Sequence, residues 1–169
     1  EDGEVVIFAT HYSGNYLSRG ADFGTLERAC DPPPLVSATL PTPESYENFE
    51  WLWSPYRVGA NWPVLIHNEY HSLGPLPCTA WKNCWYNSIA YAVSTDDAHS
   101  FVKPGAPAHT VAPAPRLWVP PPPDVPQQEW YAEGYFAPTN IVRGPDDYYY
   151  ALIFAIPAAE KEVDERGVC

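Results

Sequence analysis

Short apolar runs rich in β-branched and aromatic residues alternate with clusters of chain-breaking residues along the sequence. The apolar runs lie at residues 5–10, 64–67, 89–94, 140–142 and 148–156. Runs of this length and composition are typical of β-strands. Between them lie proline-rich clusters, which indicate turns or polyproline connections. These clusters are at residues 31–34, 73–77, 103–107 and 119–123.

Two local patterns predict more specific elements. Residues 140–154 read as a hairpin, because Gly-Pro-Asp-Asp at 144–147 can supply the turn between two strands. A short helical turn is expected around residues 42–53, since Pro43 lies near its start and Glu44 in its first turn.

The composition favours β structure and limits the classes of function. The 21 prolines interrupt long helices, because each ring removes a backbone donor and clashes with the preceding turn. With 46% hydrophobic residues the chain can build a packed core, so we expect residues 1–169 to form a single domain. The net charge of −12 argues against binding to nucleic acid or to anionic membrane surfaces. No apolar run approaches the roughly 18 residues that span a bilayer.

The four cysteines indicate an oxidising compartment. The short spacing between Cys78 and Cys84 favours a disulfide-closed loop over a zinc knuckle, which leaves Cys30 and Cys169 as partners. The alternative is a set of four reduced, buried thiols. Since small secreted domains often use such bridges, we expect a secreted, extracellular protein. Methionine is absent even at position 1, from which we expect a mature or trimmed product.

A turn motif follows the predicted strand at 87–93. The segment Ser-Thr-Asp-Asp-Ala-His-Ser-Phe at 94–101 resembles the Asp-box turn of sialidase-like propellers, with Ala98 in place of the usual glycine. In such a turn an aspartate accepts backbone donors and the aromatic residue anchors the next strand. We therefore expect Asp96 and Asp97 to be turn residues rather than catalysts.

The segment His-Asn-Glu-Tyr-His at 67–71 ends an apolar strand and carries the main candidate chemistry. Strand alternation would place His67, Glu69 and His71 on one face. A carboxylate between two imidazoles can act as an acid or base, and the three groups could also bind a metal. The alternative is a strand end whose polar groups cap neighbouring backbone. We assign no metal or cofactor to this segment.

Aromatic residues are frequent between residues 51 and 100. Flat aromatic faces beside amide and carboxylate groups suit sugar rings, whose C–H faces stack while their hydroxyls form hydrogen bonds. Trp85 and Tyr86 are candidates for a stacking surface, and Asn87 follows them directly. A buried core is the alternative role for many of these rings.

Four segments occur in an order that resembles the secreted, five-bladed β-propeller proteins related to glycoside hydrolases. They are the segment at 67–71, Cys-Trp-Tyr-Asn-Ser at 84–88, the Asp-box-like turn, and Gly-Tyr-Phe-Ala-Pro-Thr-Asn-Ile-Val at 134–142. The resemblance runs from about residue 51 to residue 169, and more faintly through His11 and Asp22. It implies a β-propeller whose inner-blade carboxylates pair a general acid with a base or nucleophile.

The length and one substitution modify what the resemblance implies. A five-bladed propeller needs roughly 250 residues, so we expect an incomplete propeller that is either a fragment or a reduced relative. Open sheet edges would then favour a homo-oligomer. Glu69 matches an acidic position of the family and is the first catalytic candidate. Ala137 stands where the family often has glutamate, so Glu133 or Asp22 is the candidate second carboxylate.

These observations predict an extracellular, carbohydrate-active protein that hydrolyses or binds a polysaccharide. Glu69, Asp22 and Glu133 are the candidate catalytic groups. The expected substrate-binding residues are His67, His71, Trp85, Tyr86 and Asn87. Two alternatives remain: a non-catalytic structural subunit of an extracellular assembly or filament, which Ala137 and the proline runs favour, and a lectin-like module that binds glycan without turnover.

Overall fold

The computed structural model describes residues 3–11, 14–29, 32–38, 40, 45–71, 85–113, 132–156 and 167–168. These residues form β-strands joined by turns, with no helical element among them, which confirms the all-β prediction. The strands are β1 (Val5–His11), β2 (Gly14–Gly20), β3 (Glu27–Ala29), β4 (Glu50–Pro55), β5 (Trp62–His71), β6 (Trp85–Ser94), β7 (Thr110–Ala112), β8 (Ala132–Phe136), β9 (Val142–Arg143), β10 (Tyr149–Tyr150), β11 (Phe154–Ile156) and β12 (Gly167–Val168).

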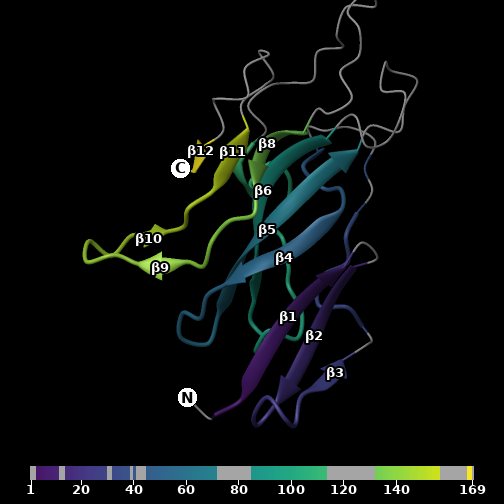
Figure 1. Ribbon diagram of the computed structural model, residues 1–169, viewed down its shortest axis with the longest axis vertical. Coiled ribbons are helices and arrows are strands. Elements are labelled where there is room, and N and C mark those ends of the chain that lie inside the picture. Colours follow the sequence, from purple (N-terminus) through teal and green to yellow (C-terminus); the bar gives the residue numbers. More distant parts are fainter. Residues whose placement is uncertain are drawn as a thin grey trace, which may run out of the picture.

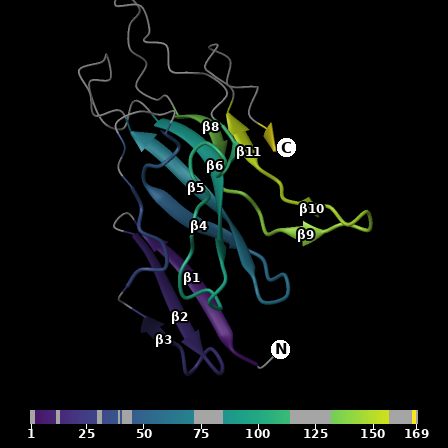
Figure 2. The same ribbon diagram turned by 180° about the vertical axis from the view of Figure 1, so that it is seen from behind.

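The strands form three sheets, none of which closes on itself (Figure 1). The main sheet has the order β12-β11-β8-β6-β5-β4, with β7 also paired to β6. A small sheet, β1-β2-β3, lies at one end of the main sheet in both views. The β9–β10 hairpin projects from the side of the main sheet (Figure 2). The hairpin predicted at residues 140–154 is confirmed by the pairing of β9 with β10.

The long β5–β6 pair is the centre of the main sheet. Its antiparallel register runs from Trp62 opposite Ser94 to His71 opposite Trp85. β4 pairs antiparallel on the other edge of β5. β8 runs parallel to β6 beside Trp85–Asn87, and β7 pairs with β6 further along. Alternation along this pair gives the sheet two faces of different character.

One face, called the core face below, is covered by the hydrophobic core. Its strands supply Leu52, Val64, Ile66, Ala90 and Ala92. The connecting segments add Leu35, Ala98 and Phe101, and Phe8 of β1 packs against the cluster. The core therefore joins the main sheet to the small sheet.

The buried side chain of Asn15 in β2 connects the small sheet to the edge strand β4. Its Nδ2 donates to the carbonyl oxygens of Glu50 (2.9 Å) and Leu35 (3.3 Å). Its Oδ1 accepts the backbone N–H of Leu52 at 2.7 Å. The amide thus replaces a neighbouring strand at β4, whose outward backbone groups would otherwise be buried without partners.

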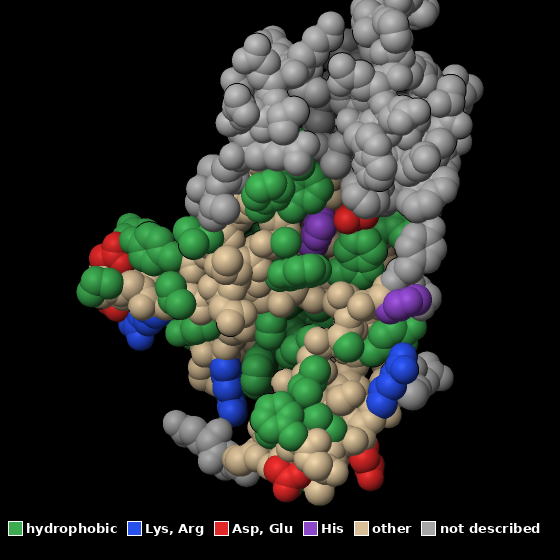
Figure 3. Space-filling model, in the orientation of Figure 1, with side chains coloured by type: hydrophobic (Ala, Val, Ile, Leu, Met, Phe, Trp, Pro, Cys, Tyr) green, Lys and Arg blue, Asp and Glu red, His purple; other side chains and the backbone are tan. Residues whose placement is uncertain are grey.

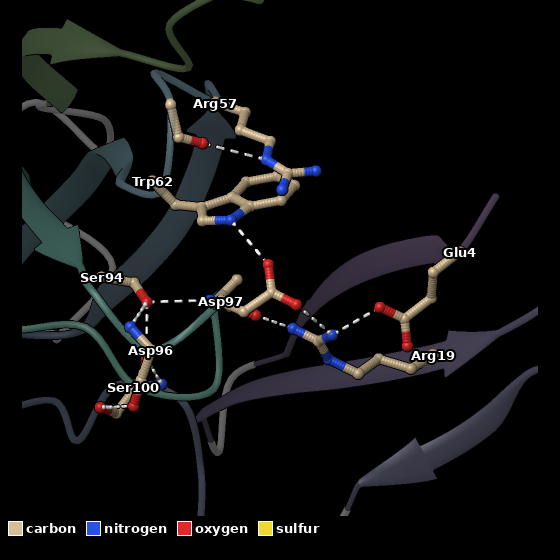
Figure 4. Close-up of polar contacts among 10 residues, drawn as sticks. Glu4, Arg19, Arg57, Trp62, Ser94, Asp96, Asp97 and Ser100 are labelled. Carbon is tan, nitrogen blue, oxygen red and sulfur yellow. Dashed lines mark hydrogen bonds and ion pairs between the residues drawn. The ribbon is translucent and has the colours of Figure 1, made fainter. Parts of the chain in front are cut away.

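The Asp-box-like turn between β6 and residue 101 has the expected local hydrogen bonds (Figure 4). Ser94 Oγ donates to Asp96 Oδ1 at 2.6 Å, and Asp96 Oδ1 also accepts the backbone N–H of Ser100 at 2.9 Å. The buried Phe101 ring joins the core, where its edge meets Phe8 at 5.7 Å between centroids. The prediction that Asp96 is a turn residue is therefore confirmed.

Asp97 points away from this turn and ties it to the small sheet. Its Oδ1 accepts the Trp62 indole N–H at 3.1 Å, and its Oδ2 lies 3.3 Å from an Arg19 guanidinium nitrogen. Arg19, from β2, also donates to the Asp97 carbonyl and pairs with Glu4 at 2.7 Å (Figure 4). Asp97 is thus also a structural residue, as expected.

Ala98 occupies the turn position that favours glycine, with φ of +64°, and its methyl group is fully buried. We expect Ala98→Val to lower the free energy of unfolding by about 2–4 kcal/mol, because a branched side chain is strained at positive φ and overfills the core. Ala98→Gly should change it by less than about 1 kcal/mol, since relief of strain offsets the lost methyl contact. Urea unfolding of both variants measures the difference. Equal stability of the two would contradict this explanation.

Two expected elements differ from the structure. Residues 42–44 of the predicted helical turn at 42–53 lie outside the described residues, but residues from Glu50 onward form β4 instead, because hydrogen bonds to β5 and to Asn15 outweigh the local helix signals. The run at 148–156 is not one strand but two short ones, β10 and β11. Between them, Leu152 is bonded to Thr139, which precedes β9: its N–H donates to Thr139 Oγ1 at 2.9 Å, and its carbonyl accepts the Thr139 N–H at 2.8 Å.

Candidate functional site

The polar residues near the C-terminal end of β5 lie on the face of the main sheet opposite the core, called the site face below. The register sets Trp51 opposite His67, and Asn87 opposite Glu69. Directly opposed residues share a face, so these side chains gather on the site face. Asn68 has the other parity and pairs with Glu50 and Ser88. The predicted alternation of His67 and Glu69 is therefore confirmed.

His67 is the centre of this group. Its Nε2 lies 3.0 Å from Asn87 Oδ1 and 3.5 Å from Glu69 Oε1. Burial lowers the pKa of His67, although the hydrogen bond to Asn87 and the charge of Glu69 act in the opposite direction. The imidazole is therefore neutral at pH 7. Since both atoms facing Nε2 are oxygen acceptors, the ring hydrogen lies on Nε2 and Nδ1 is the acceptor.

Three aromatic rings enclose the His67 imidazole. The centroids of Trp51, Trp53 and Phe136 lie 5.6, 5.7 and 5.9 Å from that of His67, all with edge-on geometry. His67 Nδ1 is buried without a hydrogen-bond partner. Trp53, by contrast, is 42% exposed. On the face drawn in Figure 3, hydrophobic side chains gather around a histidine and an acidic side chain.

The close approach of β8 brings Phe136 to this site. Gly134 pairs with Asn87, and a Cβ at Gly134 would lie 2.0 Å from the Asn87 carbonyl oxygen. Only glycine fits there, and its φ of +109° also favours glycine. The segment that follows β8 is bonded to β4, because Ser54 Oγ donates to the Pro138 carbonyl at 2.9 Å.

Asp22, a candidate second carboxylate, is not brought together with Glu69. It lies in the turn between β2 and β3, at the opposite end of the molecule from the C-terminal end of β5 (Figure 1). Its Oδ1 accepts the N–H of Gly24 at 2.8 Å and the hydroxyl of Thr25 at 3.1 Å. The carboxylate therefore closes a turn.

The other predicted site residues are described only in part. The backbone of Glu133 pairs with Tyr86, one position away from the Gly134–Asn87 pair. His71 pairs with Trp85 at the end of the β5–β6 ladder. The side chains of Glu133, His71, Trp85 and Tyr86 lie outside the described part of the structure, as do all of the cysteines, Cys30, Cys78, Cys84 and Cys169.

Sequence reasoning missed an ionic cluster at the core face, formed by Glu47, Glu50, Lys103 and His109. Lys103 Nζ lies 2.6 Å from Glu50 Oε1 and 3.1 Å from Glu47 Oε1, and His109 Nε2 lies 4.0 Å from Glu47. Burial raises the pKa of Glu50, while the bond to Lys103 opposes that rise. No motif marks this cluster, because its members are brought together only by the fold.

The site face offers one acceptor and one aromatic ring to a ligand. Glu69 supplies a carboxylate whose side chain is 10% exposed, and Trp53 supplies an exposed ring, whereas the acceptor nitrogen of His67 is buried. An acceptor beside an aromatic ring suits a neutral ligand rich in hydroxyl groups. Within the described ranges, no three His, Cys, Asp or Glu side chains are grouped to hold a metal ion.

The described residues contain no helix that is long and apolar enough to cross a membrane. A scan against protein-family models, a search of curated proteins and a search of solved structures each returned no match. The relation to propeller glycosidases therefore stays a prediction from the motifs.

Proposed function

We propose that this protein binds a polysaccharide at the site face, through the exposed ring of Trp53 and the carboxylate of Glu69, which lies against the buried pair of His67 and Asn87. One observation carries the proposal. On the face not used by the core, the exposed ring of Trp53 contacts His67, and the Glu69 carboxylate, whose side chain is 10% exposed, lies 3.5 Å from the same imidazole. This combination matches the polar edges and apolar faces of a sugar.

Hydrolysis of the bound glycan is the second candidate. The contact between Glu69 and His67 favours it, because a carboxylate beside an imidazole is a setting for proton transfer. Glycoside hydrolysis generally needs two carboxylates about 5–9.5 Å apart. Asp22 is held in a distant turn and position 137 is alanine, so Glu133 is the remaining candidate of the three proposed. Binding therefore has the stronger support.

The wider context is also a proposal. We propose an extracellular protein related to five-bladed propellers, built from an incomplete set of blades. The all-β sheets and the Asp-box-like turn support it. Edge strands support a homo-oligomer, which is the arrangement expected of a structural subunit in an extracellular assembly.

We expect Glu69→Gln to weaken glycan binding about 10- to 100-fold, because it removes a charged acceptor that a ligand hydroxyl would use. Calorimetry with soluble xylan, mannan, β-glucan and galactan measures affinity, and release of reducing sugar measures hydrolysis. If the wild-type protein is an enzyme, the same variant should abolish turnover.

The matched control is Glu27→Gln, at an exposed glutamate of β3. It removes the same charge far from the site face and should leave affinity unchanged. A Glu69→Gln variant that is folded and binds every glycan as the wild type does would remove Glu69 from the site.

A further inference from the structure

The β9–β10 hairpin exposes a cluster of large side chains, called the tyrosine arm below. The exposed fractions are 70% for Tyr148, 48% for Tyr149, 49% for Tyr150, 59% for Val142 and 56% for Leu152. Figures 1 and 2 both show the hairpin projecting away from the main sheet. Large apolar side chains gathered on one exposed element are typical of binding sites.

Specific contacts hold the tyrosine arm in place. An isolated two-stranded hairpin is marginally stable, so it needs such support. The Tyr149 ring meets the edge of Tyr56 at 5.3 Å between centroids, and the Tyr150 hydroxyl donates to Asp146. That hydrogen bond lowers the pKa of Asp146, which therefore stays charged. The rings of Tyr149 and Tyr150 are thus positioned before any ligand binds, which reduces the entropic cost of binding.

The tyrosine arm packs against the end of β4, the strand that also carries Trp53 of the candidate site. Trp53, whose ring meets His67, lies in β4, and Tyr56 follows the end of that strand. In both views β4 ends on the side from which the hairpin projects. One end of β4 thus contacts both regions, through Trp53 with His67 and through Tyr56 with Tyr149.

The chemistry of the tyrosine arm indicates what it binds. Tyrosine combines a flat apolar face with a hydroxyl group, which suits a sugar ring. Asp146 and Asp147 lie at the tip, and the chain carries a net charge of −12, so an anionic polymer would be repelled. The favoured occupant is a neutral one.

We propose that the tyrosine arm is a second glycan-binding surface, which takes the continuation of a neutral polysaccharide chain whose end or middle occupies the site at Glu69. The inference rests on the proposed function and narrows it, because the ligand must be long enough to reach from the site to the arm. Short oligosaccharides would occupy only one of the two surfaces.

The test is how affinity depends on the length of the glycan, measured by calorimetry. The variants are Tyr148→Ala and the double variant Tyr148→Ala with Tyr150→Ala. The probes are soluble xylan, mannan, β-glucan and galactan and the disaccharide of each. We expect the double variant to bind the polysaccharide about tenfold more weakly and to bind the disaccharide as the wild type does. Phe23→Ala, at an aromatic side chain that is 77% exposed in the β2–β3 turn, is the control and should change neither affinity.

Other outcomes separate the two proposals. If Glu69→Gln weakens binding of both lengths while the tyrosine variants bind polysaccharide normally, the tyrosine arm is not a glycan surface, although the proposed function stands. If the wild-type protein binds no glycan of either length, both proposals fail. A wild-type dimer in light scattering that the tyrosine variants convert to a monomer, with unchanged glycan affinity, would assign the arm to a second copy instead. Tyr148→Trp should keep the affinity for polysaccharide, which distinguishes loss of a ring from loss of the fold.

Discussion

We expect the Asn15→Leu substitution to lower the free energy of unfolding by about 3 kcal/mol. Leucine has the same branching and the same number of side-chain heavy atoms but cannot form hydrogen bonds to β4, so the Leu52 N–H and the Glu50 carbonyl would be left buried without partners. Each such group costs about 1–3 kcal/mol. Equilibrium unfolding in urea, followed by tryptophan fluorescence, gives the midpoint and the slope.

Asn140→Leu is the control for this experiment. It makes the same substitution at an exposed position, where the side chain does not join one sheet to another. It should change stability by less than about 0.5 kcal/mol. An Asn15→Leu protein with the unfolding midpoint of the control would show that this amide does not join the small sheet to β4.

Replacing Lys103 by methionine is expected to cost about 3–5 kcal/mol at neutral pH. The change leaves the fully buried Glu50 carboxylate without its ion-pair partner, and an unpaired buried charge is strongly destabilising. The free energy of unfolding from urea titrations at several pH values measures the loss.

The loss should depend on pH in a defined direction. The pKa of Glu50 in the folded protein already lies above its ordinary value, and removal of Lys103 raises it further. A carboxyl whose pKa is higher in the folded state loses stability as pH rises from the unfolded pKa to the folded pKa. The deficit of Lys103→Met should therefore shrink as the pH falls through that window. Glu50→Gln combined with Lys103→Met should recover part of the stability at neutral pH, and a deficit independent of pH would contradict the explanation.

Local patterns in the sequence predict several elements of this fold. β1, β6 and the β9–β10 hairpin follow from apolar runs bounded by turn residues, and the Asp-box-like turn follows from short-range hydrogen bonds. These features depend on neighbours within a few residues. The same holds for His67 and Glu69, whose shared face follows from alternation.

The remaining features depend on contacts between distant residues. Asn15 meets Glu50 across 35 positions, and Lys103 meets Glu50 across 53. β2 begins and ends at glycine and carries few apolar residues, so its strand is set by pairing rather than by propensity. Phe136 reaches His67 only because Gly134 lets β8 approach β6, a parallel pairing that no local signal indicates.

The most direct test of the proposed function is an NMR titration with the neutral polysaccharides named above, followed at side-chain nitrogens. If glycan binds at the site face, the Trp53 indole resonance should shift and saturate, and the ring nitrogens of His67, which Trp53 contacts, should shift with it. The Trp62 indole, which is bonded to Asp97 at the Asp-box-like turn, should stay in place. If no polysaccharide shifts Trp53 or His67, or if shifts occur only at residues away from the site face, the assignment of the site would be wrong.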